Sequence, residues 1–348
     1  MMEAVLFLTE SNGVATITLN RPKAINSLTH DMLAAIREKL QIWEKDENVQ
    51  LVILKGAGTK GLCAGGDIKA LYEAKENEKK MAEAIAFFDV EYKTDLLMQQ
   101  FSKPIIASLD GIVMGGGVGL SYGCSHRVVT QRTKWAMPEM NIGFFPDVGA
   151  AYFLNRAPGC IGRYLALNAT VLRGADVCHI NGADYYMNDE NLAALLQEIS
   201  HINWHEENRD NKLHLLFSKY AEEPEIESGK LANLQGDIDR HFKHDTVENI
   251  ISSLEADDSE FAQQTKLNML SKSPVSLKVT LTQLIRGEEK SFEACLKTDL
   301  ILAKNFMEHD DFYEGVRSVL IDKDQQPAYQ YRQLADVTET FVDSFFTN

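Results

Sequence analysis

The spacing of hydrophobic and polar positions changes along the chain, and it predicts where strands and helices lie. Apolar residues recur at helical spacing over 30–44, after Thr29 as a capping residue, and a long helix is predicted over 81–100. Short apolar runs with the length and branching of buried strands occupy residues 5–8, 14–19, 51–54 and 105–109. Strands that alternate with such helices favour a layered α/β fold.

The pattern changes near residue 190, where strand-like runs give way to helical periodicity. We therefore predict a core over 1–200 and a mostly helical region over 201–348, with a soft boundary between Asn188 and Asp210. A polar loop is expected over 224–236. The helices predicted in the second region cover 191–201, 212–220, 245–254, 259–272, 274–286, 291–309 and 338–346.

Charge and cysteine usage exclude several classes of protein. The chain carries a net charge of −16, whereas a nucleic-acid binder needs a basic surface for the phosphate backbone. The five cysteines are scattered and form no CxxC pair, so we expect neither a disulfide framework nor a zinc site, and we expect a reducing compartment. An anionic small molecule held by a local cluster of Lys and Arg stays compatible with this acidic balance.

The apolar runs and the first residues bear on location. No apolar run reaches the length that spans a membrane. The first residues, Met-Met-Glu-Ala-Val, lack the basic, Arg- and Ser-rich composition of a leader. The sequence therefore predicts a cytoplasmic protein, unless a leader was removed. It predicts no membrane or nucleic-acid partner, and it does not indicate an oligomeric state.

The stretch from Pro104 to Gly149 carries the residues with the clearest chemistry. Its apolar run ends at the turn Asp110-Gly111, and Gly115-Gly116-Gly117 then leads into a predicted helix. Glycines at such a junction let the backbone approach a ligand, and the first amides of a helix have no internal partners. Glu139 and Asp147 follow, each beside a proline in an apolar setting. Free amides with two acids near apolar surface are the parts that acyl chemistry needs.

A second glycine-rich turn follows another predicted strand, over residues 55–68. It reads Lys-Gly-Ala-Gly-Thr-Lys-Gly-Leu-Cys-Ala-Gly-Gly-Asp-Ile. Asp67 stands where the next helix is predicted to begin, and an Asp side chain there commonly accepts hydrogen bonds from the first backbone amides. The chain thus has two junctions of the same strand-glycine-helix kind.

Four ordered sequence blocks carry a resemblance to a known family. They are Asn20-Arg21-Pro22 with Asn26, residues 63–68, residues 114–117, and Pro138-Glu139 followed by Gly143. Together they resemble the crotonase superfamily, also called the enoyl-CoA hydratase/isomerase family, in order and in approximate spacing. The resemblance implies a spiral of ββα turns for the first part of the chain, a helical C-terminal part and an acyl-CoA substrate.

The resemblance also implies which residues touch the substrate. The thioester carbonyl is expected to bind the backbone amides of Gly66 and Gly116, with Ala64 among the neighbouring substrate contacts. Glu91 is implied as a further contact, although an acid on a helix can also simply pair with a Lys or Arg. CoA is part of the substrate, and no metal or redox cofactor is implied.

The two acids leave more than one route open. Glu139 could attack the carbonyl and form a mixed anhydride, or it could act as a general base towards water. Asp147 could bind the substrate's 3-hydroxyl, position water or move a proton, and it could also cap a following helix. Two nearby carboxylates tend to push their pKa values apart, which would allow one acid and one base.

One position separates hydrolysis from hydration. Hydratases of this superfamily usually carry a second glutamate two residues beyond the three glycines, and here that position is Gly119. Together with residues 143–149 and 309–324, this makes the chain most similar to the branch that hydrolyses short 3-hydroxyacyl-CoA thioesters, with 3-hydroxyisobutyryl-CoA from valine breakdown as the expected substrate. The alternatives are an enoyl-CoA hydratase or isomerase, in which Asp147 takes the missing role, and a non-catalytic acyl-CoA-binding protein.

Overall fold

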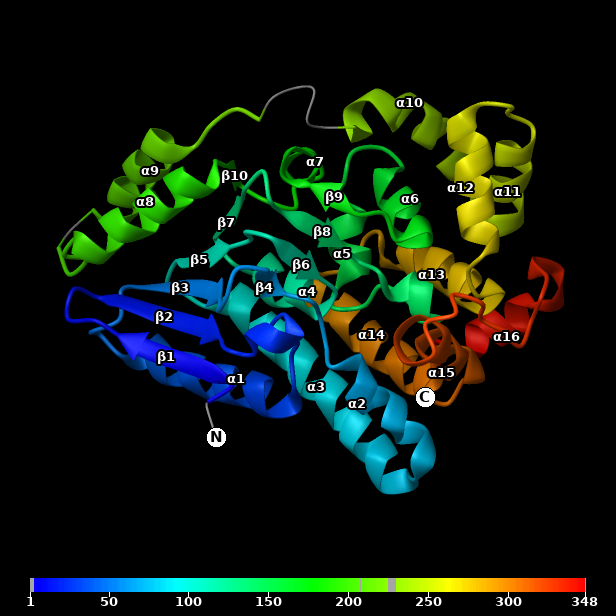
Figure 1. Ribbon diagram of the computed structural model, residues 1–348, viewed down its shortest axis with the longest axis horizontal. Helices are drawn as coiled ribbons and strands as arrows, with labels where there is room; N and C mark the ends of the chain where they lie inside the picture. Colours follow the sequence, from blue (N-terminus) through cyan, green and yellow to red (C-terminus); the bar gives the residue numbers. More distant parts are fainter. Residues whose placement is uncertain (1–2, 207, 225–229, 348) are drawn as a thin grey trace. The chain divides into compact units, whose positions relative to one another are not determined.

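The computed structural model describes residues 3–206, 208–224 and 230–347 (Figure 1). The chain divides into two compact units. Both units draw on distant parts of the chain, so neither coincides with the predicted ranges 1–200 and 201–348, and the predicted division stays a prediction. Unit 1 comprises Met1–Gly66, Lys93–Trp135 and Leu172–Ala232, and unit 2 comprises Asp67–Tyr92, Ala136–Val171 and Asn233–Asn348.

Unit 1 contains a six-stranded sheet in the order β1-β2-β3-β5-β7-β10. β1 (Val5–Thr9) and β2 (Val14–Leu19) pair antiparallel as a hairpin. From β2 onwards, neighbouring strands are parallel. The four apolar runs predicted as strands are therefore strands. The other members of the sheet are β3 (Leu51–Gly56), β5 (Ile105–Ser108), β7 (His126–Val129) and β10 (Tyr185–Tyr186).

A second sheet, in the order β4-β6-β8-β9, positions the two glycine-rich turns. β4 (Gly61–Cys63) ends directly before Ala64, and β6 (Ile112–Met114) ends directly before Gly115. β4 and β6 pair in parallel, so their carboxyl ends meet at the same edge of the sheet, where ligands commonly bind. β8 (Lys134–Ala136) and β9 (Leu172–Arg173) complete it. These strands are too short for periodicity to reveal.

Helices pack on the large sheet and form the core of unit 1. α1 (His30–Lys45) begins after Thr29, whose hydroxyl accepts a hydrogen bond from Met32 N at 3.3 Å, as predicted. α4 (Gly116–Tyr122) and α7 (Gly174–His179) are short. α8 (Asp189–His201) and α9 (Arg209–Tyr220), drawn in green in Figure 1, pack on the sheet. This layer buries Val14, Leu51, Ile53, Ile106, Val128, Leu192, Leu195, Ile199, Leu213 and Phe217.

The described elements of unit 2 are helices and turns, apart from the end of β8. Within the described residues, no helix combines the length and apolar character needed to cross a bilayer. α3 (Glu78–Gln100) begins three residues before the predicted start and passes through the division at Tyr92–Lys93. The others are α2 (Ile68–Tyr72), α5 (Ala150–Leu154), α6 (Ile161–Asn168), α10 (Leu231–Phe242), α11 (Val247–Glu255), α12 (Glu260–Leu270), α13 (Pro274–Gly287), α14 (Phe292–Met307), α15 (Asp310–Val316) and α16 (Glu339–Ser344).

Two local predictions need correction. The polar loop over 224–236 is wrong from Leu231, where α10 begins and buries Leu231 and Ile238 among its polar residues; residues 225–229 of that loop lie outside the described residues. Asp67 does precede α2, but its side chain makes no capping hydrogen bond. Position alone therefore does not make an aspartate a cap.

Candidate active site

The two glycine-rich turns of unit 1 lie against each other. Gly65 has φ +100°, and a Cβ on it would lie 3.2 Å from Met114 O and 3.6 Å from Gly116 N. The backbone conformation favours glycine there, and the distance to Met114 O leaves little room for a side chain. Gly116 is the first residue of α4, so its N–H has no partner within the helix. The parallel pairing of β4 and β6 thus brings the predicted amide-bearing turns together.

Residues 64–66 of one glycine-rich turn are hydrogen-bonded to residues 25–28. Ala64 N donates to Ile25 O at 3.0 Å, and Leu28 N donates to Gly65 O at 2.9 Å. Gly66 forms a parallel bridge with Leu28. Ala64 N is therefore engaged in the fold, whereas the roles of the Gly66 and Gly116 amides towards a carbonyl stay predictions.

The two predicted acids belong to unit 2 and form one buried cluster with a tyrosine. Glu139 begins the 3-10 turn η3 (Glu139–Ile142), and Asp147 follows Pro146 shortly before α5. Both side chains are buried, with 8% of Glu139 and 5% of Asp147 exposed. Tyr92 of α3 donates its hydroxyl to Asp147 Oδ2 at 2.7 Å. The residue at the cap of α5 is Gly149, without a side-chain cap bond, so the capping alternative for Asp147 is wrong.

Burial changes the proton affinity of all three groups. Desolvation raises the pKa of Glu139 well above its ordinary value, and the charge of Asp147 adds to this rise. Desolvation also raises the pKa of Asp147 to about 6, while the hydrogen bond from Tyr92 acts in the opposite direction. Desolvation, followed by the charge of Asp147, raises the pKa of Tyr92, which keeps its hydroxyl a donor. Buried acids whose pKa values are raised in this way are typical of sites of proton transfer and nucleophilic attack.

Two residues that the sequence analysis missed hold the backbone on both sides of Asp147. Asp299 Oδ2 accepts a hydrogen bond from Gly149 N at 2.8 Å, and Asp299 Oδ1 accepts one from Gln283 Nε2 at 2.9 Å. Gln283 Nε2 also donates to Pro146 O at 3.0 Å. Both side chains are buried, and we call them the Asp299–Gln283 clamp. Burial raises the pKa of Asp299 to about 8.

The clamp holds a strained turn. Val148, directly after Asp147, has φ +51°. A β-branched residue rarely adopts this conformation, and it persists only where the surroundings enforce it. Such strain commonly lies at functional sites. The signal in the sequence was present: Asp299 stands at helical spacing among Cys295, Leu296, Leu302 and Phe306, where the pattern predicts an apolar side chain.

The remaining predicted contact, Glu91, also lies in unit 2. It precedes Tyr92 on α3 and is 2% exposed. Its charge contributes to the raised pKa of Tyr92, so it lies within electrostatic range of the acid cluster. The structure therefore places Glu91, Glu139 and Asp147 in unit 2, and Ala64, Gly66 and Gly116 in the glycine turns of unit 1. Among the described residues, no group of three or more His, Cys, Asp or Glu side chains is arranged to hold a metal ion.

Comparison with known proteins gives a consistent picture across the chain. A family model described as Enoyl-CoA hydratase/isomerase matches residues 14–346. Proteins named "3-hydroxyisobutyryl-CoA hydrolase, mitochondrial" from Xenopus laevis and Homo sapiens are each 40% identical, over 98% and 97% of this chain and 88% of each relative. The protein of that name from Mus musculus is also 40% identical, over 99% of this chain and 89% of the relative.

Solved structures agree with the fold. A carnitinyl-CoA dehydratase from Mycobacterium thermoresistibile matches with a TM-score of 0.91 and 37% identity, over 100% of this chain and 97% of that chain. An enoyl-CoA hydratase from Rhodobacter sphaeroides matches with a TM-score of 0.88 and 31% identity, over 99% of this chain and 97% of that chain. Both matches extend through the C-terminal helices as well as the sheets.

Proposed function

The chain belongs to the enoyl-CoA hydratase/isomerase family, and on that premise we propose that it hydrolyses the thioester of a short 3-hydroxyacyl-CoA, with 3-hydroxyisobutyryl-CoA as the substrate. The observation that carries the proposal is the buried pair Glu139 and Asp147, together with the absence of a carboxylate at Gly119. The names of the relatives, 40% identical over nearly the whole chain, support the choice of substrate. The reaction would belong to valine breakdown.

Hydrolysis needs donors for the carbonyl oxygen and a group that delivers oxygen to the carbonyl carbon. Negative charge develops on the carbonyl oxygen, and each fixed N–H donor aimed at it is worth about 3–4 kcal/mol of barrier. We assign this role to the amides of Gly66 and Gly116. Water supplies the new C–O bond, the C–S bond breaks, and the CoA thiolate takes up a proton. No metal or redox cofactor is needed for these steps.

We assign the attack on the carbonyl to Glu139, directly as nucleophile or through a water molecule. Incorporation of ¹⁸O into the protein after a single turnover in ¹⁸O-labelled water would identify the anhydride route. Opening of a mixed anhydride by attack at the Glu139 carboxyl carbon leaves ¹⁸O in the protein, whereas a general base, or opening at the acyl carbon, places the label in the product alone. Asp147, held by Tyr92, serves to position water or the 3-hydroxyl, or to move a proton.

Release of free thiol tests the reaction. We expect release of CoA from 3-hydroxyisobutyryl-CoA, followed with a thiol reagent, to exceed release from other acyl-CoA thioesters in a panel. A second candidate, hydration or dehydration, is favoured by the names of the two solved relatives; it predicts addition of water to crotonyl-CoA without thiol release. Binding of acyl-CoA with no turnover of any thioester would contradict both and indicate a binding protein.

Replacing Tyr92 by Phe is expected to move the pH dependence. The acid pair must hold a negative charge to act as base or nucleophile, so kcat/KM falls as the pH drops through the pair's apparent pKa. The Tyr92 hydrogen bond lowers the pKa of Asp147, and its loss raises that pKa. The fall in kcat/KM of Tyr92→Phe should therefore begin at a higher pH than in the wild type, measured between pH 4.5 and 9. An unchanged profile would contradict the role of this bond.

Location is a separate proposal. The sequence predicts a cytoplasmic protein, while the vertebrate relatives are named mitochondrial, which describes those proteins. Fractionation of source cells, with the protein followed by immunoblotting beside cytoplasmic and organelle markers, distinguishes the two compartments. Recovery with the organelle markers would contradict the cytoplasmic prediction.

A further inference from the structure

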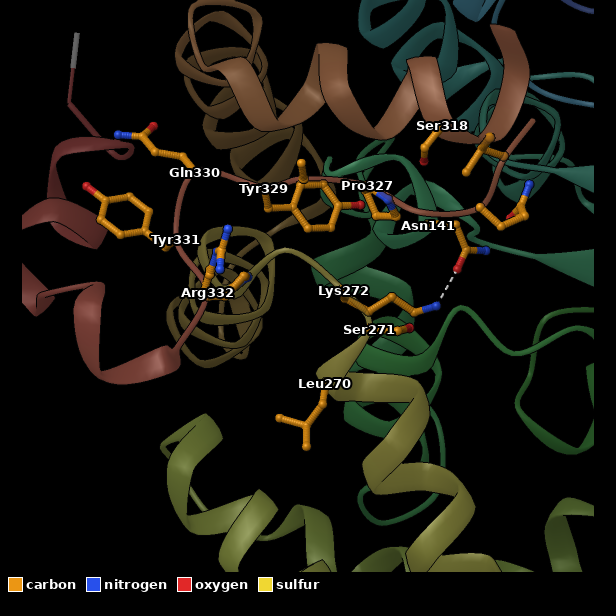
Figure 2. A pocket seen from close by; sticks show the side chains of 14 residues that line it. Asn141, Leu270, Ser271, Lys272, Ser318, Pro327, Tyr329, Gln330, Tyr331 and Arg332 are labelled. Carbon is orange, nitrogen blue, oxygen red and sulfur yellow. Dashed lines mark hydrogen bonds between the residues drawn. The ribbon is translucent and has the colours of Figure 1, made fainter. Parts of the chain in front are cut away.

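A cavity of about 880 Å³ lies in unit 2, apart from the buried acid cluster (Figure 2). Its volume is within the range of pockets that hold small molecules. The wall comes from the end of α12, the start of α13 and the segment 325–332, which we call the strap. Lys272, Asn141, Ser318, Tyr329, Tyr331 and Arg332 are among the lining residues.

The strap has a defined position because backbone amides bind buried or neutralised acids. Ala328 N donates to Glu314 Oε1 at 2.7 Å, and Gln330 N donates to Asp311 Oδ1 at 2.8 Å. Glu314 also accepts two hydrogen bonds from Arg317. These hydrogen bonds fix the position of the strap, so the wall of the cavity that the strap forms has a defined structure.

The charge of the lining has one sign. Lys272 and Arg332 both line the cavity, and none of the described lining residues is acidic. This local excess of positive charge contrasts with the net charge of −16 for the chain. The neighbouring acids are engaged elsewhere: Asp311 accepts from Ser273 Oγ at 2.6 Å, and Glu314 is paired with Arg317. An anion would therefore find cationic donors among the described lining residues, while the negative charges of Asp311 and Glu314, which also reach Tyr329, are held by these partners.

Lys272 is poised to bind a further group. Among the described residues its Nζ donates one hydrogen bond, to Asn141 Oδ1 at 2.7 Å, which Figure 2 draws as a dashed line. An ammonium group has three donors, and a neutral amide does not balance its charge. Partial burial of Lys272 lowers its pKa by desolvation. A bound anion would supply both the missing charge and the missing acceptors.

The cavity is also connected to the acid cluster through the backbone. Asn141 belongs to the same 3-10 turn as Glu139. Lys272 therefore contacts, through Asn141, the turn that carries the proposed nucleophile or base. An anion that withdraws the Lys272 ammonium from Asn141 changes the hydrogen bonds on this turn.

We propose that this cavity binds a nucleoside phosphate, with Lys272 holding the phosphate groups, Tyr329 of the strap contacting the base, and Arg332, on the other side of Tyr329, adding positive charge to the cavity (Figure 2). Lys is a common phosphate binder and Arg binds phosphate through paired N–H groups. Tyr329 offers an aromatic face and a hydroxyl donor to the base, whereas the Tyr331 ring already packs on Phe341, with 5.6 Å between the ring centroids. A bound nucleoside phosphate regulates catalysis by changing the turn that carries Glu139. This regulatory role rests on the proposed hydrolase function, whereas binding itself does not.

Calorimetric titration of the full chain with ADP, pyrophosphate and adenosine tests the site. We expect saturable binding of ADP, weaker binding of pyrophosphate and of adenosine, and loss of affinity as the salt concentration rises. Lys272→Met should weaken ADP binding at least tenfold, and Arg332→Gln on the exposed strap should weaken it as well. Lys266→Met is the matched control, because Lys266 lies on α12 and pairs with Glu255 outside the cavity.

The outcomes separate this site from the acyl-CoA site. ADP binding of equal strength in Lys272→Met and in the wild type would place ADP elsewhere, including the acyl-CoA site, and would overturn the proposal. No saturable binding to the wild type at millimolar ADP would overturn it too. Circular dichroism establishes that each variant is folded, and Arg332→Gln keeps the test valid if Lys272→Met is not. Because no thioester is present, failure here is distinct from failure of the hydrolase activity.

Discussion

Glu139→Gln is expected to lower kcat for thioester hydrolysis by about 10³-fold, because general acid–base groups typically contribute 10²- to 10⁴-fold. The amide has nearly the shape of the carboxyl group but offers neither a nucleophile nor a base. KM should change little, because the role that we assign to Glu139 is the attack on the carbonyl and not the binding of the CoA portion. Initial rates of thiol release at saturating 3-hydroxyisobutyryl-CoA measure the effect.

The same substitution should leave the fold intact or strengthen it. Burial raises the pKa of the Glu139 carboxyl, which means that the ionised form is costly inside the protein, and a neutral amide avoids that cost. The exposed Glu289→Gln is the matched control and should keep wild-type activity. Residual activity above a tenth of the wild-type rate in Glu139→Gln, with a normal melting temperature, would remove Glu139 from its role.

The sequence predicted the large elements well because their burial patterns are regular. The run at 51–54 is continuously apolar, the run at 14–19 contains only Thr16 and Thr18 besides apolar residues, and the two runs form the parallel pair β2 and β3. The short strands β4 and β6 could not be predicted, because three residues are too few to show a hydrophobic periodicity. Their pairing nevertheless decides that the two glycine turns lie at one sheet edge. The sequence analysis missed the start of α10 for another reason. The polar and glycine residues of this helix are typical of a loop, and only the structure shows which of its residues are buried.

The candidate site could be predicted only as far as motifs and chemistry extend. Glu139 and Asp147 were identifiable because a family motif surrounds them. Their mutual influence, the Tyr92 hydrogen bond and the exclusion of helix capping needed coordinates. Asp299 lies about 150 residues after Asp147 in the sequence, and no local pattern connects them. Only the fold brings α14 to the turn that carries the acid.

That clamp creates a demanding pattern of donors and acceptors. Gly149 N and Gln283 Nε2 both point hydrogens at the Asp299 carboxyl, and Gln283 Nε2 also serves Pro146 O. Two acceptor oxygens are required on residue 299. An amide there has one oxygen and one NH₂ group, so one donor faces another donor. Rotating the Gln283 amide to relieve this conflict would take its N–H from Pro146 O. Every arrangement therefore loses a hydrogen bond.

Asp299→Asn should consequently lower kcat by about 10²-fold, a loss that a displacement of about 1 Å at a catalytic group can produce, with a much smaller change in KM. The unpaired donor should cost about 1–3 kcal/mol of unfolding free energy. Burial raises the pKa of Asp299 to about 8, whereas an unfolded Asp titrates near pH ~4. This carboxyl therefore stabilises the fold below its unfolded pKa, and that contribution is lost as the pH rises through its folded pKa.

The amide at position 299 does not titrate, so the difference in melting temperature between the wild type and Asp299→Asn should narrow as the pH rises from about 4 to about 8. Leu254→Ala provides a matched loss of stability, because Leu254 is fully buried on α11 away from the acids. Assayed well below its melting temperature, it should keep the wild-type kcat. The clamp would be structural support alone if Asp299→Asn also kept kcat within twofold of the wild type. The same would follow if Leu254→Ala lost as much kcat as Asp299→Asn. A selective loss of kcat with a pH-dependent stability difference requires that Asp299 acts through the geometry of Asp147.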